Sequence, residues 1–287
     1  MRGPALRHRL ARPEILIAPG AHDALAARII ERAGFEAVYF TGAGFSYTHL
    51  GTPDLGLVTL SETVGRVAAI AEATGLPVIA DGDTGYGNAL NVGRAVREFE
   101  RAGAAAIQLE DQTFPKRCGH LTGKTVISTA EMVGKIKAAV DARREGILVI
   151  GRTDARAVEG FEAALERALR YKEAGADILF VEAPESRAEL ERLARALPAP
   201  AMANMVEGGA TPLLPARELE AMGYRLVIFP GAAVRAAAAA MARVMAVLRE
   251  HGTTEPLRDA MLTFGELNDL LGLGEFQRRE ERYLKGT

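Results

Sequence analysis

The chain has 287 residues, of which 48% are hydrophobic and 25% charged, and this composition is that of an ordinary soluble globular protein. Its formal charge of −2 and its lack of a basic stripe with interleaved aromatics argue against nucleic acid and anionic membranes as partners and favour a small molecule. A single cysteine can form neither an internal disulfide nor a CxxC site, which indicates a reducing compartment, by default the cytoplasm.

In chain order, residues 1–14 are basic but contain no apolar core, which argues against a secretory signal and leaves an organellar transit segment as the alternative. No window of about 18 uncharged apolar residues follows, because Arg235 and Arg243 interrupt even the alanine-rich run 232–248, so we expect no membrane span. Eight short apolar runs predict strands, separated by segments of helical period that stop at glycine. The predicted strands are 14–20, 37–42, 77–83, 105–111, 147–154, 177–183, 199–205 and 225–231.

Strands that alternate with helices, without a linker or a shift in composition, predict an α/β protein with a parallel sheet. For eight such units a closed (β/α)8 TIM barrel is the economical arrangement, since that fold typically takes about 250 residues. An open doubly wound sheet is the alternative, but the GxGxxG turn expected after its first strand is missing from residues 18–29.

Helices predicted over 232–250, 254–270 and 275–284 exceed what a barrel needs. We therefore expect one domain over 1–287, with 250–287 as a helical extension that packs on a neighbouring subunit. Such packing would make the protein a homo-oligomer.

Polar residues gather where the predicted strands end, and in this fold the loops after the strands build the active site. In chain order they are Thr41–Gly42–Ala43–Gly44, Asp81 and Asp83, Glu110–Asp111, Arg152 and Asp154, Glu182 and Asn204. Scattered surface charge would not produce this placement, so we expect these side chains to lie together.

Asp81 and Asp83 lie two residues apart, so on an extended backbone both carboxylates point to the same side. With Glu110 on the next strand they offer hard oxygen ligands, which favours Mg2+ or Mn2+ over Zn2+. The alternative is a plain turn, because "DGDTGYGN" is rich in turn-forming residues.

Other strand ends are suited to binding a carboxylate. The "TGAGF" stretch could present backbone N–H groups to an anion, or be a flexible turn. Arg152 could clamp a substrate carboxylate, with Glu182 as its structural partner. The loops "NMVEGGATP" and "FPGAAVRA" could form a phosphate site or be plain loops; we favour loops with substrate contacts from Asn204 and Arg235.

The only cysteine, Cys118, lies in the stretch "PKRCGH", directly after the strand-4 acids. Neighbouring cations lower the pKa of a thiol and make it a usable proton donor or nucleophile. The alternative is an exposed structural loop; the position after the acids favours chemistry.

Five segments together resemble the isocitrate lyase and phosphoenolpyruvate mutase superfamily, particularly its short-chain methylisocitrate lyase and dimethylmalate lyase members. They are "GTPDLG" (51–56), "DGDTGYGNALNV" (81–92), "LEDQTFPKRCGHLTGK" (109–124), "GRTDA" (151–155) and "NMVEGGATPL" (204–213). The resemblance covers residues 14–250 and implies a (β/α)8 barrel whose last helix is swapped between subunits of a tetramer.

The resemblance also implies roles for individual residues. Asp81 and Asp83 would hold Mg2+, with Glu110 reached through water and Asp54 nearby. The carboxylate of the α-keto product would be bound by Arg152 and by the turn at Thr41, Gly42 and Ala43. Tyr39 would lie near the reacting centre and Gly119 at the substrate. Cys118 would be the acid that protonates the departing carbanion. Lys116, Arg117 and His120 would lower the pKa of the thiol or bind the far carboxylate of the substrate.

Two positions depart from the methylisocitrate lyase pattern, because Val206 replaces a threonine and Phe264 replaces an arginine. An apolar replacement leaves a third carboxylate unpaired, so we expect a smaller 2-hydroxy dicarboxylate of the 2,3-dimethylmalate or 2-methylmalate type. The alternatives are 2-methylisocitrate lyase, a phosphonate mutase such as carboxyvinyl-carboxyphosphonate phosphorylmutase, an oxaloacetate decarboxylase-like enzyme, and a catalytically silent scaffold barrel.

Overall fold

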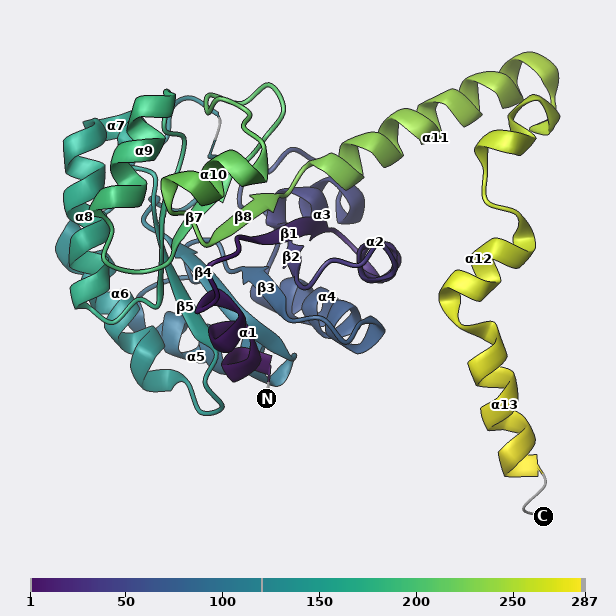
Figure 1. Ribbon diagram of the computed structural model, residues 1–287, viewed down its shortest axis with the longest axis horizontal. Helices are drawn as coiled ribbons and strands as arrows, with labels where there is room; N and C mark the ends of the chain where they lie inside the picture. The colour runs from purple at the N-terminus through teal and green to yellow at the C-terminus, as the bar shows by residue number, and fades with distance from the viewer. Residues whose placement is uncertain (1, 120, 285–287) are drawn as a thin grey trace.

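The computed structural model describes residues 2–119 and 121–284, and its centre is a closed barrel of eight parallel strands in sequence order (Figure 1). The strands are β1 (Leu16–Ala21), β2 (Val38–Phe40), β3 (Val78–Asp81), β4 (Ala104–Glu110), β5 (Leu148–Thr153), β6 (Ile178–Val181), β7 (Ala201–Asn204) and β8 (Leu226–Phe229). Pairing of β1 with β8 closes the barrel. Each predicted apolar run overlaps one strand to within a residue of its bounds, so the expected TIM barrel is confirmed.

Helices surround the strands, and the chain continues into further helices after β8. They are α1 (Arg2–Leu10), α2 (Ala24–Arg32), α3 (Gly42–His49), α4 (Leu60–Ala73), α5 (Ala89–Arg101), α6 (Thr129–Ala142), α7 (Arg156–Glu159), α8 (Phe161–Glu173), α9 (Arg187–Ala196), α10 (Ala216–Met222), α11 (Ala232–His251), the 3-10 helix η1 (Glu255–Ala260), α12 (Phe264–Leu271) and α13 (Leu273–Leu284). The helix predicted over 254–270 is in fact two, η1 and α12. The break falls at Met261 and Leu262, before Thr263 caps α12 by accepting from the Glu266 N–H.

Successive strand residues alternate between two hydrophobic clusters, one inside the barrel and one beneath the outer helices. In β3, Val78 and Ala80 belong to the outer cluster and Ile79 to the inner one. The N-terminal helix α1 closes the lower end of the barrel, because Leu6 and Leu10 are buried in the inner cluster. The strand interior is therefore packed, and polar groups can face the axis only near the carboxyl ends of the strands.

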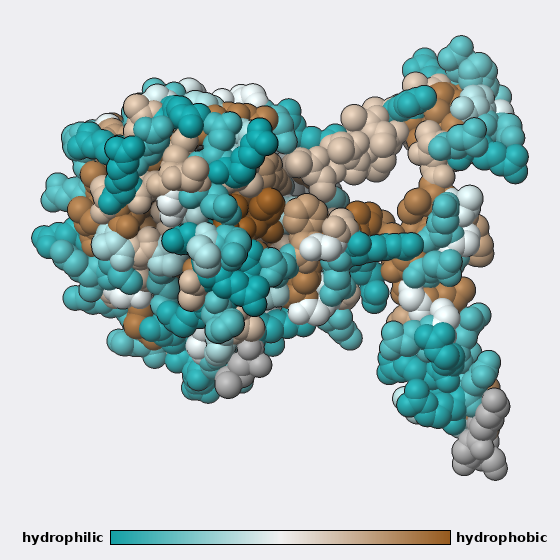
Figure 2. Space-filling model, viewed as in Figure 1, coloured by the Kyte–Doolittle hydropathy of each residue, from teal (hydrophilic) through white to brown (hydrophobic). Residues whose placement is uncertain are grey.

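The helices α11, α12 and α13 form an arm that projects from the barrel in Figure 1. Along α11 only Val234 is buried, while Met241 and Met245 are each 58% exposed. Figure 2 shows hydrophobic surface on this arm and on the barrel face next to it. Within residues 2–119 and 121–284, no helix is both long and apolar enough to cross a membrane.

Candidate active site

The two-residue period of the strands selects which polar side chains face the axis of the barrel. Counting on by two from inward Ile79 gives Asp81, from inward Ile150 gives Arg152, and from inward Phe180 gives Glu182. These side chains meet at the carboxyl end of the barrel in a cavity of about 100 Å³. Of the predicted site residues, its lining includes Tyr39, Thr41, Ala43, Asp54, Asp81, Lys116, Cys118, Gly119, Arg152, Glu182, Asn204 and Arg235.

Three further predicted residues lie beside this cavity rather than on its wall. Gly42 and Asp83 line a smaller neighbouring pocket that also includes Asp54 and Asp81. Glu110 is 1% exposed and pairs with Arg152. His120 lies outside the described residues.

The "TGAGF" stretch begins helix α3 and is not a flexible turn. Thr41 is its N-cap, and the Thr41 hydroxyl accepts from the Gly44 N–H at 3.1 Å. A Cβ atom on Gly42 would lie 2.9 Å from Asp81 Oδ2, so only glycine lets the helix approach this carboxylate so closely. The positive end of the α3 dipole therefore faces the acids of strand β3.

Lys116 occupies the centre of the acid cluster. Its Nζ lies 2.7 Å from Asp54 Oδ1 and 2.7 Å from Asp83 Oδ1, and the residue is 3% exposed. Burial opposes the charge of this amine, yet Asp83 and Asp54 hold its pKa well above the usual value. Burial raises the pKa of Asp83 to about 6, against the attraction of Lys116.

The oxygens of the acid cluster fit a hard divalent cation. The cluster already accommodates a positive charge on Lys116, and Glu110 Oε1 is buried without a hydrogen-bond partner among the described residues. Asp83 has a left-handed backbone with φ of 48°, a strained conformation for a non-glycine residue that directs its carboxylate toward the cluster. In this arrangement no three metal-ligating side chains of the described chain converge on one point. Mg2+ needs fewer, because one or two carboxylates with waters and substrate usually hold it.

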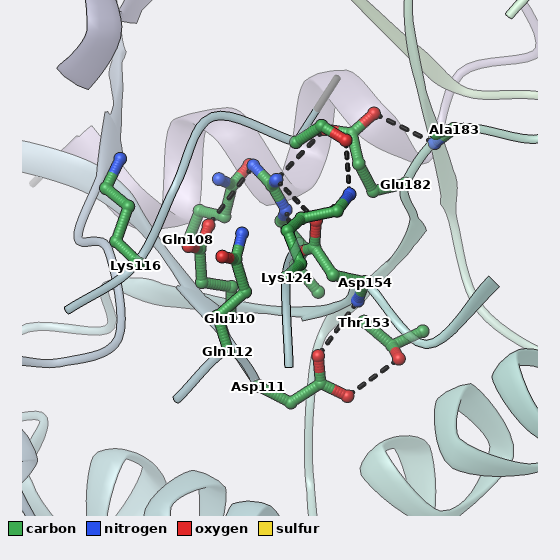
Figure 3. A network of polar contacts seen from close by, with 12 residues as sticks. Gln108, Glu110, Asp111, Gln112, Lys116, Lys124, Thr153, Asp154, Glu182 and Ala183 are labelled. Carbon is green, nitrogen blue, oxygen red and sulfur yellow. Dashed lines mark hydrogen bonds and ion pairs between the residues drawn. The ribbon is translucent and has the colours of Figure 1, made fainter. Parts of the chain in front are cut away.

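The guanidinium of Arg152 is fixed by three carboxylates, those of Glu110, Asp154 and Glu182, which are labelled in Figure 3. It lies 3.2 Å from Glu110 Oε2, 2.8 Å from Asp154 Oδ2 and 3.1 Å from Glu182 Oε2. Burial opposes its charge, but these acids hold the pKa of Arg152 well above the usual value. Asn204 adds a bond from its amide nitrogen to Glu182 at 3.2 Å. The arginine therefore cannot rotate away from the cavity without breaking several ion pairs.

Asp111 faces away from the cavity because it lies one residue after inward Glu110. It is wholly buried and accepts from the Tyr171 hydroxyl at 2.6 Å, the Thr153 hydroxyl at 2.7 Å and the Asp154 N–H at 2.8 Å. Arg167 lies 3.3 Å away. Asp111 thus belongs to the structural support behind Asp154, and through it behind Arg152, although the sequence grouped it with the site acids.

The loop 112–124, which carries Cys118, lies against this charged wall. The Lys124 amine donates to the Gly119 carbonyl and lies 3.0 Å from Asp154 Oδ1, and the Cys118 N–H donates to the Asp54 carbonyl at 3.2 Å. A Cβ atom on Gly119 would lie 2.5 Å from Arg152 Nη2. The loop is therefore seated directly on the guanidinium, with the half-buried Cys118 beside the cavity.

Gln108 is the site residue that sequence reasoning missed. It is 1% exposed, accepts from the Tyr39 hydroxyl at 3.2 Å and donates to Asp81 Oδ1 at 3.2 Å. Burial and the nearby Asp81 raise the pKa of Tyr39 well above its usual value. The available signal was a polar residue two positions before Glu110, on the inward face of an otherwise apolar strand.

The two specificity positions have different places in the structure. Val206 lines the cavity, whereas Phe264 is 87% exposed at the start of α12 and is absent from the cavity lining. Arg235 lines the cavity too, and its guanidinium donates to the Glu207 carbonyl at 2.7 Å. Within one chain, only the Val206 part of the sequence argument can act on the substrate.

Comparisons with known proteins agree on one family. Residues 6–249 match the family model described as phosphoenolpyruvate phosphomutase. The 2,3-dimethylmalate lyase of Eubacterium barkeri is 52% identical over 98% of this chain and 98% of that protein. The 2-methylisocitrate lyase of Aeropyrum pernix is 48% identical over 97% of this chain and 90% of that protein.

Two solved structures have the same fold over nearly the whole chain. A crystal structure of 2,3-dimethylmalate lyase superposes with a TM-score of 0.94 at 38% identity, covering 99% of this chain and 95% of that one. A phosphonopyruvate hydrolase complex with oxalate and Mg2+ superposes with a TM-score of 0.88 at 33% identity, covering 99% of both chains.

Proposed function

This chain belongs to the phosphoenolpyruvate mutase and isocitrate lyase superfamily, and we propose that it cleaves a 2-hydroxy dicarboxylate of the 2,3-dimethylmalate type. It is a carbon–carbon lyase, as its named relatives are. The products would be pyruvate, or another α-keto acid, and a short carboxylic acid. The observation that carries the proposal is a cavity that joins Asp81 at the end of β3, the fixed Arg152 and the loop bearing Cys118.

The proposed reaction breaks the bond between C2 and C3 of the substrate. When the 2-hydroxyl gives its proton to a carboxylate of the cavity, C2 becomes the keto carbon and the bonding electron pair moves to C3. The carboxylate on C3 delocalises this pair until C3 is protonated. Cys118 is the proposed proton donor, because its thiol lies beside the cavity on a loop that also carries cations.

Asp81 and Asp83 would hold a Mg2+ ion, with Glu110 and Asp54 next to it. The phosphonopyruvate hydrolase complex of the same fold contains this ion, which would supply Lewis-acid stabilisation of the developing oxygen charge here. Lys116 would have to leave its present place between Asp54 and Asp83 to make room. Mn2+ has the same ligand preference and is the alternative ion.

The substrate carboxylates have two proposed partners in the cavity. Arg152 would bind the carboxylate that remains on the keto acid, together with the start of α3 at Thr41, Gly42 and Ala43. The loop seated at Gly119 would exclude water from the carbanion. Val206 offers no hydrogen bond to a third carboxylate, and burying such a group unpaired costs roughly 2 kcal/mol or more.

The arm of α11 to α13 supports a homo-oligomer. We propose that these helices exchange between subunits of a tetramer, since most of their large hydrophobic side chains are exposed in the single chain. The apolar surface on the barrel face beside the arm would then be covered as well. A cytoplasmic location is proposed on the basis of the single cysteine.

The test is a substrate panel in the presence of Mg2+. 2,3-Dimethylmalate, 2-methylmalate and 2-methylisocitrate would be supplied separately, with release of α-keto acid coupled to a dehydrogenase. We expect turnover of one of the two malate derivatives, with loss of turnover on chelation of the metal or in Cys118→Ser. No keto acid from any panel member would refute the lyase, and preferred cleavage of 2-methylisocitrate would refute the substrate argument built on Val206.

A further inference from the structure

Gln108 is buried in a place where an amide is costly. It lies on the inward face of β4, in register with Asp81 of β3 and with Ile150 of β5, an apolar side chain that helps fill the barrel. A buried amide without hydrogen bonds costs stability, and an alkyl side chain would pack here without that cost. Gln108 makes both of its contacts to site residues, namely Tyr39 and Asp81.

The chemistry of these partners fixes which way the amide points. A carboxylate can only accept hydrogen bonds, so the nitrogen Nε2 of Gln108 must face Asp81, and their distance is 3.2 Å. The oxygen Oε1 is then left for the Tyr39 hydroxyl, also at 3.2 Å. Because that oxygen can only accept, the single hydroxyl proton of Tyr39 points at Gln108.

This arrangement determines what Tyr39 offers to a ligand. Tyr39 is 2% exposed and lines the cavity, so any part of its oxygen that faces the cavity presents a lone pair and no proton. We propose that Gln108 is a positioning residue that holds Tyr39 as a hydrogen-bond acceptor for the 2-hydroxyl of the substrate. This inference rests on the proposed function, and it adds a specificity rule: a 2-hydroxy acid gains a bond at Tyr39 that a 2-keto acid lacks.

The rule weakens the binding of the product relative to the substrate. The substrate hydroxyl donates to Tyr39, which aligns its O–H bond toward the barrel wall. After cleavage the same position is a carbonyl oxygen, which accepts only and meets an acceptor. The product therefore loses one hydrogen bond at the moment it forms, which assists its release.

The experiment compares lactate with pyruvate, which differ only in carrying a hydroxyl or a carbonyl at C2. Dissociation constants would be measured by ligand-observed NMR titration in saturating Mg2+, for the full-length wild type and for Gln108→Met. Methionine keeps the length of the side chain and removes both hydrogen bonds. We expect lactate affinity to fall about 2- to 10-fold, the usual range for one neutral hydrogen bond, with pyruvate affinity unchanged or increased because Tyr39 can then turn its proton to the ligand.

A structural role alone would weaken both ligands equally, and that result, or no change in either, would overturn the inference. Tyr39→Phe removes the acceptor itself and should reproduce the selective loss of lactate; combining it with Gln108→Met should add no further loss. If Gln108→Met does not fold, the Tyr39→Phe result alone decides by the same criterion. Gln277→Met, on the exposed face of α13, controls for the substitution. Since both ligands are inert, the titration remains decisive even if the substrate panel finds no turnover.

Discussion

Gly119→Ala is predicted to prevent the loop 112–124 from closing while the barrel stays intact. The new Cβ would lie 2.5 Å from Arg152 Nη2 and 2.6 Å from Glu182 Oε2, closer than real contacts of this type. Neither partner can yield cheaply, because the two are joined to each other at 3.1 Å within a buried set of ion pairs. Overpacking of this kind costs about 1–3 kcal/mol, and here it applies to the closed loop only.

A penalty of that size reduces the closed population about 5- to 150-fold relative to the open one. The assay uses the only cysteine of the chain, because Cys118 is half-buried in the closed arrangement and its alkylation by iodoacetamide reports opening. We expect the alkylation rate to rise and kcat/KM on the preferred substrate to fall, each within that range. The midpoint of thermal unfolding should stay at the wild-type value.

Gly134→Ala is the matched control, because Gly134 lies inside α6 and a Cβ there meets nothing within 4 Å. It should leave alkylation and turnover unchanged, and should stabilise the helix by about 0.5–1 kcal/mol. An alkylation rate of Gly119→Ala within twofold of the wild-type rate would refute the reasoning, because the loop would then close without the close contact between Gly119 and Arg152.

Three other predictions concern the support of the site and the arm. Tyr171→Phe removes a donor from buried Asp111 and should lower the free energy of unfolding by about 1–3 kcal/mol in urea denaturation; an unchanged midpoint would contradict this role. Lys116→Met leaves the two carboxylates that it binds without a cation, so the metal-free protein should lose about 3–5 kcal/mol of stability, with recovery in Mg2+; equal loss in Mg2+ would count against a metal site there. Removal of residues 252–287 should reduce the number of subunits per particle, measured by light scattering. If the molar mass falls only by the mass of the removed residues, the number of subunits is unchanged and exchange of the arm is contradicted.

The barrel could be predicted from the sequence because its signal is local. Each apolar run, and each helix that ends at glycine, can be recognised within about ten residues. Eight repeats of the strand–helix unit then leave few alternative folds. The same period of two gives the facing of Asp81, Arg152 and Glu182. Applied one step further back, it would have identified Gln108, whose polar side chain at an inward position was the exception in an apolar strand.

What the sequence did not provide depends on contacts between distant segments. Nothing near Lys116 indicates that its amine would lie between Asp54 and Asp83, because the first of these is 62 residues away. Asp111 was grouped with the site acids because the sequence analysis considered only its position at a strand end, and not whether its side chain points into the barrel or away from it. Phe264 was aligned with an arginine that binds substrate in methylisocitrate lyases. In the single chain it lies on the arm that projects from the barrel, away from the cavity.

Helix α1 closes the base of the barrel, so substrate and products must use the same opening at the other end. Leu6 and Leu10 fill the lower end, and the strand interior above them is packed, which leaves the mouth beneath the loop 112–124 as the route in and out. One substrate becomes two products in a cavity of about 100 Å³, and both must leave by that route before the next substrate arrives. The loop must then open at least once in every cycle, so its opening rate is an upper limit on kcat.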